Sequence, residues 1–175
     1  MNDAPVFSRP VRVDALPSEP LARAIEADAE ERAALAKLNR LPAIAKLAAT
    51  FTLRRLGRDG ARVTGVVRAE FTQICVVSIE PFPATLDEEV DVRFAPPDEK
   101  REERRGEFIA FDEEDPPDPI VDGVIDLGAL AAEFFALALD PYPRKPGVSF
   151  TPPAEQDETG SPFAALSRWP EKPRG

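Results

Sequence analysis

Five carboxylates stand within seven positions of one acidic stretch of the chain. They belong to Asp112, Glu113, Glu114, Asp115 and Asp118. Such a density of acidic side chains could hold a hard cation or supply the paired acid and base of a catalytic site. The order lacks the glycine and the closing glutamate of a calcium loop, and an exposed charge run is usually only solvated. We therefore predict no metal here, and the first four acids become candidates for contact with a positively charged partner.

Other residues that could carry catalysis are scarce. The chain has no histidine, which removes the commonest general base and the most frequent transition-metal ligand. Its single cysteine, Cys75, lies on the apolar side of an alternating segment, where a thiol stays protonated and inert. We predict that Cys75 packs in the core, and that the chain has no catalytic residue and no cofactor.

Five arginines surround the glycine-containing turn at residues 57–60. They are Arg54, Arg55, Arg58, Arg62 and Arg68. Guanidinium groups clustered in this way can contact the phosphates of a nucleic acid. They are the candidate residues for direct RNA binding, which is the alternative to a protein partner.

Tyr142 and Arg144 lie between prolines in the segment DPYPRKP. A backbone preset by proline loses little entropy on binding, so both side chains are candidates for partner contact. The alternative is a turn packed against the sheet, with Tyr142 covering a strand edge. Glu133, the one charge in the run 127–139, is better explained by a salt bridge to an arginine such as Arg144 or by exposure than by a catalytic pocket.

Two helical patterns are present. Asp126 is placed to cap a helix from Leu127 to Leu139, whose apolar residues leave almost no polar face, so this helix must be buried. Pro141 ends it. The spacing of apolar residues from Leu21 to Leu38 predicts a second, amphipathic helix.

The remaining elements are strands. Gly57–Gly60 predicts a tight hairpin, and the alternation from Ala61 to Val77 predicts the clearest strand of the chain. Leu86 to Phe94 predicts an antiparallel partner, and Phe7 to Leu16 an edge strand. In Leu41 to Leu56 the early alanines favour helix, whereas the second half favours strand, and we predict strand for that half.

These elements predict an α+β fold, an antiparallel sheet of about four to five strands packed with two helices. Residues 1–150 form one domain, followed by a flexible, proline-rich tail at 151–175. Residues 96–119 form an acidic insertion at the rim of the sheet, with ten acids and four bases between residues 98 and 118. Within it, Phe108 to Phe111 could form a short strand at the sheet edge or a loop whose aromatics pack locally.

The charge balance restricts the class of partner. The net charge of -10 and the pI of about 4.6 argue against general affinity for phosphate backbones and favour a basic protein, although negative charge also serves solubility alone. One cysteine excludes an internal disulfide, and the N-terminus lacks the pattern of a secretory signal. No apolar run reaches the roughly 20 residues that span a bilayer. We predict a cytoplasmic protein without a membrane partner.

Two segments carry a family resemblance. The stretch 122–147, DGVIDLGALAAEFFALALDPYPRKPG, and the earlier segment Gln73–Pro81, QICVVSIEP, resemble the YceD family of large ribosomal RNA subunit accumulation proteins. The resemblance runs from about Phe7 to Phe150, with a weaker echo at Ser161–Leu166. Many members carry two nearby cysteines where this chain has only Cys75, so no zinc site is expected.

The resemblance implies a non-catalytic, cytoplasmic factor needed for normal levels of large-subunit ribosomal RNA, with a family link to a basic large-subunit ribosomal protein. We therefore predict a non-enzymatic ribosome biogenesis factor that supports accumulation or processing of 23S ribosomal RNA. Its acidity favours binding of a basic ribosomal protein over direct binding of RNA.

Overall fold

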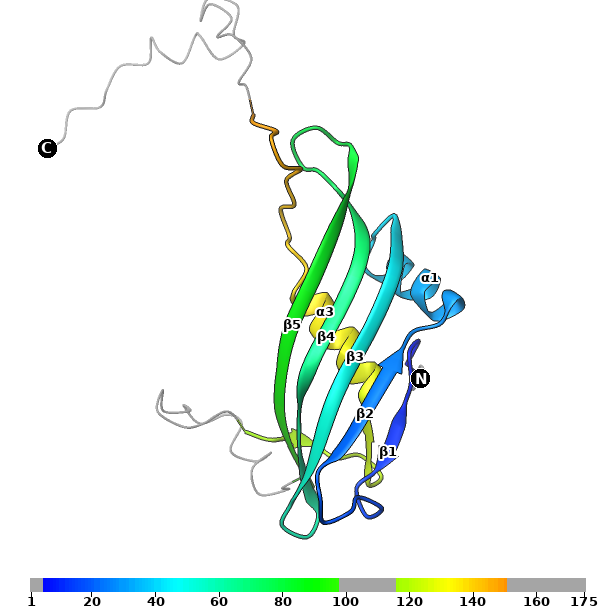
Figure 1. Ribbon diagram of the computed structural model, residues 1–175, viewed down its shortest axis with the longest axis vertical. Coiled ribbons are helices and arrows are strands. Elements are labelled where there is room, and N and C mark those ends of the chain that lie inside the picture. Colours follow the sequence, from blue (N-terminus) through cyan, green and yellow to red (C-terminus); the bar gives the residue numbers. More distant parts are fainter. Residues whose placement is uncertain (1–4, 98–115, 151–175) are drawn as a thin grey trace, which may run out of the picture.

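The computed structural model describes residues 5–97 and 116–150 (Figure 1). In chain order its elements are β1 (Pro10–Arg12), β2 (Leu21–Glu26), α1 (Ala29–Leu38), β3 (Ala43–Leu56), β4 (Gly60–Ile74), β5 (Pro81–Ala95), β6 (Asp118–Pro119), β7 (Val124–Asp126) and α3 (Leu127–Leu137). One sheet has the strand order β2-β3-β4-β5-β6, and β1 pairs with β7 in a second sheet. The predicted α+β class is confirmed.

Three long strands, β3, β4 and β5, dominate the sheet. The chain turns between the first two at Gly57, whose φ of 61° is the left-handed conformation that the predicted hairpin required. Both neighbours of β4 run antiparallel to it. Among the described strands, only the short β6 pairs in parallel, at the end of β5. The predicted hairpin and the predicted partner strand are therefore confirmed.

The core lies between one face of this sheet and α3, which is behind the sheet in Figure 1. Alternate residues of β4 such as Val63 and Val67 are buried on this inner face, because side chains of a strand point to opposite sides in turn. The ring of Phe135 from α3 meets Phe71 of β4 edge-on at 5.4 Å between centroids. The helix predicted at 127–139 is confirmed, and it ends two residues early.

The helix predicted from Leu21 to Leu38 is wrong in its first half. Residues Leu21–Glu26 form β2, which pairs with β3, and the helix begins only after Asp28. Asp28 accepts the backbone N–H of Glu31 at 2.8 Å, and the Glu31 carboxylate accepts the N–H of Asp28 at 2.8 Å. This reciprocal cap places the start of α1, and it leaves the residues before it free to pair with a strand.

Tertiary pairing also decided the ambiguous segment. The whole of β3 is strand, including the alanine-rich first half, because Leu47 and Ala49 alternate into the core while the backbone pairs on both sides. The predicted strand from Ala61 ends at Ile74 rather than Val77, and Cys75 lies in the turn that follows. The strand predicted at Phe7–Leu16 is confirmed only at Pro10–Arg12.

Candidate functional site

The predicted partner-binding acids lie outside the described residues. Asp112, Glu113, Glu114 and Asp115 belong to this part of the chain, as do both alternatives for Phe108–Phe111. After this gap, β6 pairs with the end of β5 at Phe94 and Ala95, and the N–H of Ile120, just beyond β6, donates to the Ala95 carbonyl at 2.8 Å. The ends of the acidic insertion are thus held at this end of the sheet.

The segment with Tyr142 and Arg144 crosses the turn between β4 and β5. The Val76 N–H donates to the Pro143 carbonyl at 2.9 Å, and the Lys145 ammonium lies 2.8 Å from the Glu80 carboxylate. The side chains of Tyr142 and Arg144 take no part in this docking, because Tyr142 is 72% exposed and Arg144 is also exposed. The alternative in which Tyr142 covers a strand edge is therefore wrong, and both side chains face solvent.

Cys75 is buried, as predicted, but its surroundings are polar. Its sulfur lies in the turn after β4, where the Ser78 N–H points at it from 3.4 Å. The Ser78 hydroxyl, which has no other polar partner among the described residues, and the N–H groups of Lys145 and Ser78 lower the pKa of the Cys75 thiol to about 6. These donors reach the sulfur because β4 ends at Ile74, one residue before Cys75, and not at Val77 as the alternation predicted.

We expect the Cys75 thiolate to form with a midpoint near pH 6, since donated hydrogen bonds stabilise the charged sulfur. Ultraviolet absorbance of the thiolate during a pH titration measures this midpoint. The Cys75→Ser variant is the control and should show no transition. A midpoint near the ordinary value of about 8.5 contradicts the expectation.

The five candidate arginines do not act as one group. Arg62 makes two bonds to Asp91 at 2.7 and 2.6 Å, and Arg68 lies 2.6 Å from Asp87. Arg55 donates to the carbonyls of Leu16 and Arg58 at 3.3 and 3.1 Å. Within the described chain, this leaves the side chains of Arg54 and Arg58 without a hydrogen bond or ion pair. The guanidinium of Arg62 in turn lowers the pKa of the Asp91 carboxyl.

Strand pairing adds an arginine that sequence reasoning missed. Arg54 of β3 stands opposite Arg62 of β4, which stands opposite Arg93 of β5, so the three form one row across the sheet. A shallow depression at the same end is lined by Arg12, Arg55 and Arg58 together with Asp14 and Asp59. The alternation of β5 placed Arg93 outward, but only the register could place it in this row.

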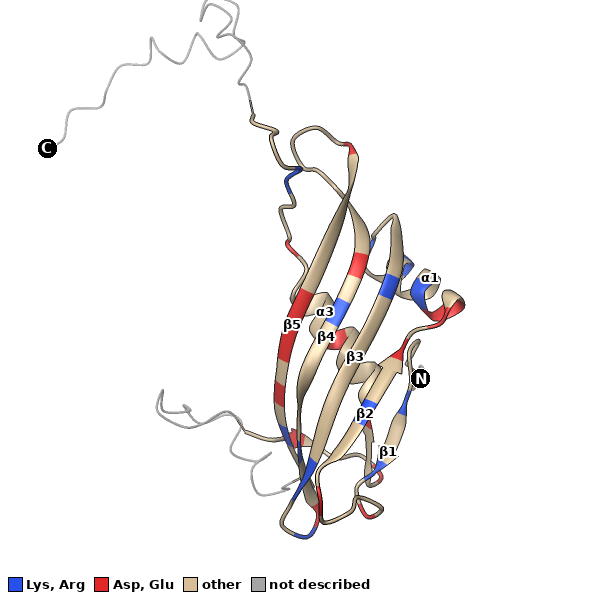
Figure 2. Cartoon of the chain, viewed as in Figure 1, with Lys and Arg blue, Asp and Glu red and all other residues tan. Residues whose placement is uncertain are grey.

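Acidic side chains follow one another along β5. Asp87, Glu89 and Asp91 alternate with inner residues and project from the outer face of the sheet, where Figure 2 shows the red positions of β5. Asp87 and Asp91 stay 68% and 54% exposed although each has an arginine partner. Glu89 has no ion pair with a described residue. We call these three residues the β5 acidic column.

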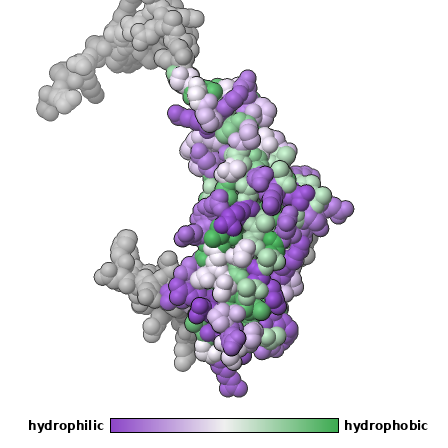
Figure 3. All heavy atoms as spheres, in the orientation of Figure 1, coloured by the Kyte–Doolittle hydropathy of each residue, from purple (hydrophilic) through white to green (hydrophobic). Residues whose placement is uncertain are grey.

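Figure 3 shows the same face as a surface in which hydrophilic side chains are interspersed with apolar ones. Small residues such as Ala48, Thr50 and Thr52 of β3 lie on this face between β2 and β4.

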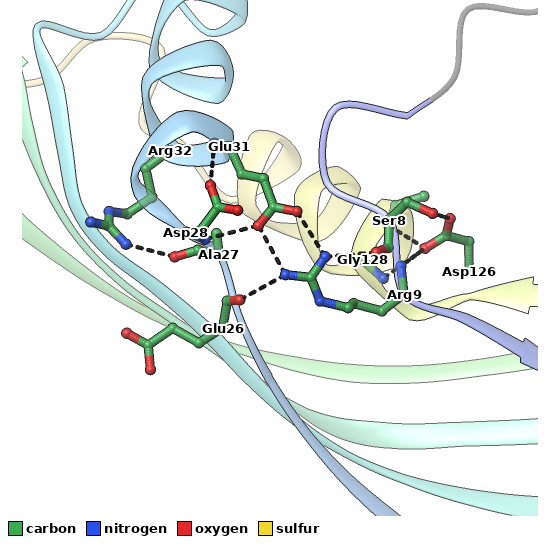
Figure 4. A network of polar contacts seen from close by, with 10 residues as sticks. Ser8, Arg9, Glu26, Ala27, Asp28, Glu31, Arg32, Asp126 and Gly128 are labelled. Atoms are coloured by element: carbon green, nitrogen blue, oxygen red, sulfur yellow. Dashed lines mark hydrogen bonds and ion pairs between the residues drawn. The ribbon is translucent and has the colours of Figure 1, made fainter.

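A polar network joins the N-terminal segment to both helices (Figure 4). Arg9 binds Glu31 of α1 through two contacts of 2.7 and 3.0 Å, and it also donates to the Glu26 carbonyl at 3.1 Å. Ser8 donates to Asp126 at 2.5 Å, at the start of α3. The hydrogen bond from Arg9 lowers the pKa of Glu31. The network anchors the N-terminal segment and offers no reactive group.

Other sites find no support among the described residues. In residues 5–97 and 116–150, no group of three acidic or cysteine side chains is placed to hold a metal ion. Within the same ranges, no helix is long and apolar enough to cross a membrane. Glu133 is exposed at the rim of α3, as one of the predicted explanations required, and no ion pair joins it to Arg144 in the described chain.

Comparison with known proteins gives one match. Residues 63–168, more than half of the 175-residue chain, match the family model described as "Large ribosomal RNA subunit accumulation protein YceD". No curated protein and no solved structure matches the chain. The matched stretch begins in β4 rather than at Phe7, and it contains both segments that carried the resemblance.

Proposed function

The chain belongs to the YceD family, the large ribosomal RNA subunit accumulation proteins, and on this premise we propose that it supports accumulation of that RNA by binding a basic large-subunit ribosomal protein. It acts without catalysing a reaction. The family match carries the role in RNA accumulation, and the family has no known catalytic activity. The choice of a basic protein as the partner rests on charge and exposure and not on the family match.

Charge and exposure support a basic protein as the partner. The chain carries a net charge of -10, and the β5 acidic column presents carboxylates on an exposed face. Such a surface attracts a positively charged partner and repels phosphate. Tyr142 and Arg144, exposed beside the turn that ends β4, are further candidate contacts. We keep Asp112, Glu113, Glu114 and Asp115 in the proposal on sequence grounds alone.

We expect depletion of the protein in growing cells to lower the ratio of large- to small-subunit ribosomal RNA. The reason is that large-subunit RNA not assembled with its proteins is lost while small-subunit RNA is unaffected. Electrophoresis or sequencing of total RNA measures the ratio, and re-expression of the wild-type chain should restore it. An unchanged ratio in growing cells contradicts the role in accumulation.

Direct binding of RNA is a second candidate, and the arginine row favours it. Arg54, Arg62 and Arg93 occupy paired positions on β3, β4 and β5 at one end of the outer face. Arg55 and Arg58 lie near this end, at the adjoining depression. Five basic side chains in one region could contact successive phosphates of a strand.

Salt dependence separates the two candidates. RNA held by arginines loses affinity steeply as salt rises, because each neutralised phosphate releases counterions. The measurement is binding of purified protein to large-subunit RNA fragments at low and physiological salt. The double variant Arg54→Ala with Arg93→Ala is compared with Arg40→Ala, an exposed arginine just beyond α1. Steep salt dependence lost only in the double variant identifies RNA as the partner and overturns the proposed protein partner.

A further inference from the structure

We propose that the outer edge of β5, from Thr85 to Asp91, binds an extended segment of a basic protein as an added strand. In the bound segment of the partner, lysine or arginine residues alternate with apolar residues. The inference rests on the proposed function for the class of partner, and it adds the site and the mode of binding. Backbone pairing, side-chain alternation and charge each contribute one part of the argument.

The edge of β5 is unpaired over most of its length. Among the described residues, the neighbouring strand β6 reaches only Phe94 and Ala95. The Cys75 N–H donates to the Glu80 carbonyl at 2.9 Å, and pairing of β4 with β5 continues in register from there to Phe94. Hydrogen-bonded and non-bonded pairs alternate in an antiparallel ladder. The backbone N–H and C=O groups of even-numbered residues of β5 therefore bond to β4, and those of odd-numbered residues point away from β4.

Two observations agree with this alternation. Pro81 and Pro83, which have no N–H to donate, both occupy outward positions. The Ala95 carbonyl, also at an odd position, accepts the Ile120 N–H on the outer side. From Thr85 to Asp91, the outward N–H groups are those of Thr85, Asp87, Glu89 and Asp91. A strand laid along this edge would find donors and acceptors at every second residue.

The side chains at the edge define the sequence of the occupant. On the outer face the edge carries the β5 acidic column, which pairs with basic side chains across an added strand. On the inner face Leu86 and Val92, which lie on either side of Glu88 and Val90, are only half-buried against the core, so apolar side chains beside them would extend it. Basic and apolar residues must therefore alternate in the segment that fits.

Charge excludes a second copy of this chain as the occupant. Two β5 edges would place carboxylates against carboxylates, because Asp87, Glu88, Glu89 and Asp91 are all acidic. Acidic residues and prolines on an edge strand are a known protection against such self-pairing. The same charges leave the edge accessible to a cationic strand, and the exposed pairs with Arg62 and Arg68 are weak enough to exchange partners.

The test uses a synthetic nine-residue peptide of alternating lysine and valine, with the full-length protein. A control peptide of the same composition carries its lysines and valines in two blocks. Amide hydrogen exchange should show new protection at the N–H groups of Thr85, Asp87, Glu89 and Asp91 with the alternating peptide only. The even-numbered amides of β5 are already bonded to β4 and should change little.

Two variants at one position separate backbone pairing from charge. Glu89→Gln removes the carboxylate, and we expect affinity for the alternating peptide to fall about twofold to threefold. Glu89→Pro also removes an outward N–H without breaking the bonds to β4, and the fall should be about tenfold. An unchanged thermal transition shows that Glu89→Pro still folds, as the tolerance of Pro81 and Pro83 leads us to expect.

Several results overturn the inference. They are absence of protection at the four outward amides of the wild-type protein, equal binding of both peptides, or equal affinities of the two Glu89 variants. These results concern peptide binding by the purified protein. A lowered RNA ratio on depletion together with any of them leaves the proposed role in RNA accumulation in place and removes only the added strand.

Discussion

Gly65→Ala is expected to destabilise the protein by about 3 kcal/mol, because the added methyl group has no space in the middle of β4. A Cβ at this position would lie 2.1 Å from the Thr50 carbonyl oxygen and 2.8 Å from Cδ1 of Phe51. Phe51 is fully buried and stands opposite Gly65, so its ring occupies the space that a side chain would need. Urea unfolding measures the change in the free energy of unfolding.

The neighbouring substitution Thr64→Ala is the control for Gly65→Ala. Thr64 lies on the outer face of the same strand, where it pairs with Thr52, and its truncation creates no clash. We expect a change of about 1 kcal/mol or less for Thr64→Ala. Equal stability of Gly65→Ala and the wild type would mean that β3 and β4 are not packed as closely as their pairing requires.

Asp126→Ala should lower the free energy of unfolding by about 3 kcal/mol at neutral pH. The Asp126 carboxylate accepts four hydrogen bonds, from the Ser8 hydroxyl at 2.5 Å and from the N–H groups of Arg9, Gly128 and Ala129 at 2.7, 2.9 and 3.1 Å. Two of these cap α3, and the other two tie the N-terminal segment to it. Glu133→Gln, at an exposed acid of the same helix, is the matched control and should change little.

The effect of Asp126→Ala should also depend on pH. Burial by itself raises the pKa of Asp126, but the bonds from Ser8, Arg9, Ala129 and Gly128 outweigh it and lower this pKa below its ordinary value. A carboxylate whose pKa is lower in the folded protein stabilises the fold fully at pH values above its pKa in the unfolded chain. This stabilisation is lost as pH falls through the pKa that the group has in the folded protein. The difference between variant and wild type should therefore shrink below about pH 4. A stability difference between Asp126→Ala and the wild type that stays constant down to pH 3 would show that the negative charge of Asp126 does not contribute to stability.

Several elements followed from local sequence alone. Asp126 capped its helix, Gly57 permitted the hairpin, and the alternation of β4 placed its apolar residues on one face. Each of these signals acts between residues close in the chain, where side-chain type and spacing decide the backbone conformation directly. The fold class and the family resemblance could therefore be read from such segments.

The candidate sites depended on the tertiary structure. The row of Arg54, Arg62 and Arg93, the outward amides of β5 and the contact of Ser8 with Asp126 all join residues far apart in the chain. Local spacing holds no information on strand register, which is decided by which apolar faces pack together. The same pairing energy held Leu21–Glu26 and the alanines of β3 in strands, against the helical spacing of the first and the helix propensity of the second.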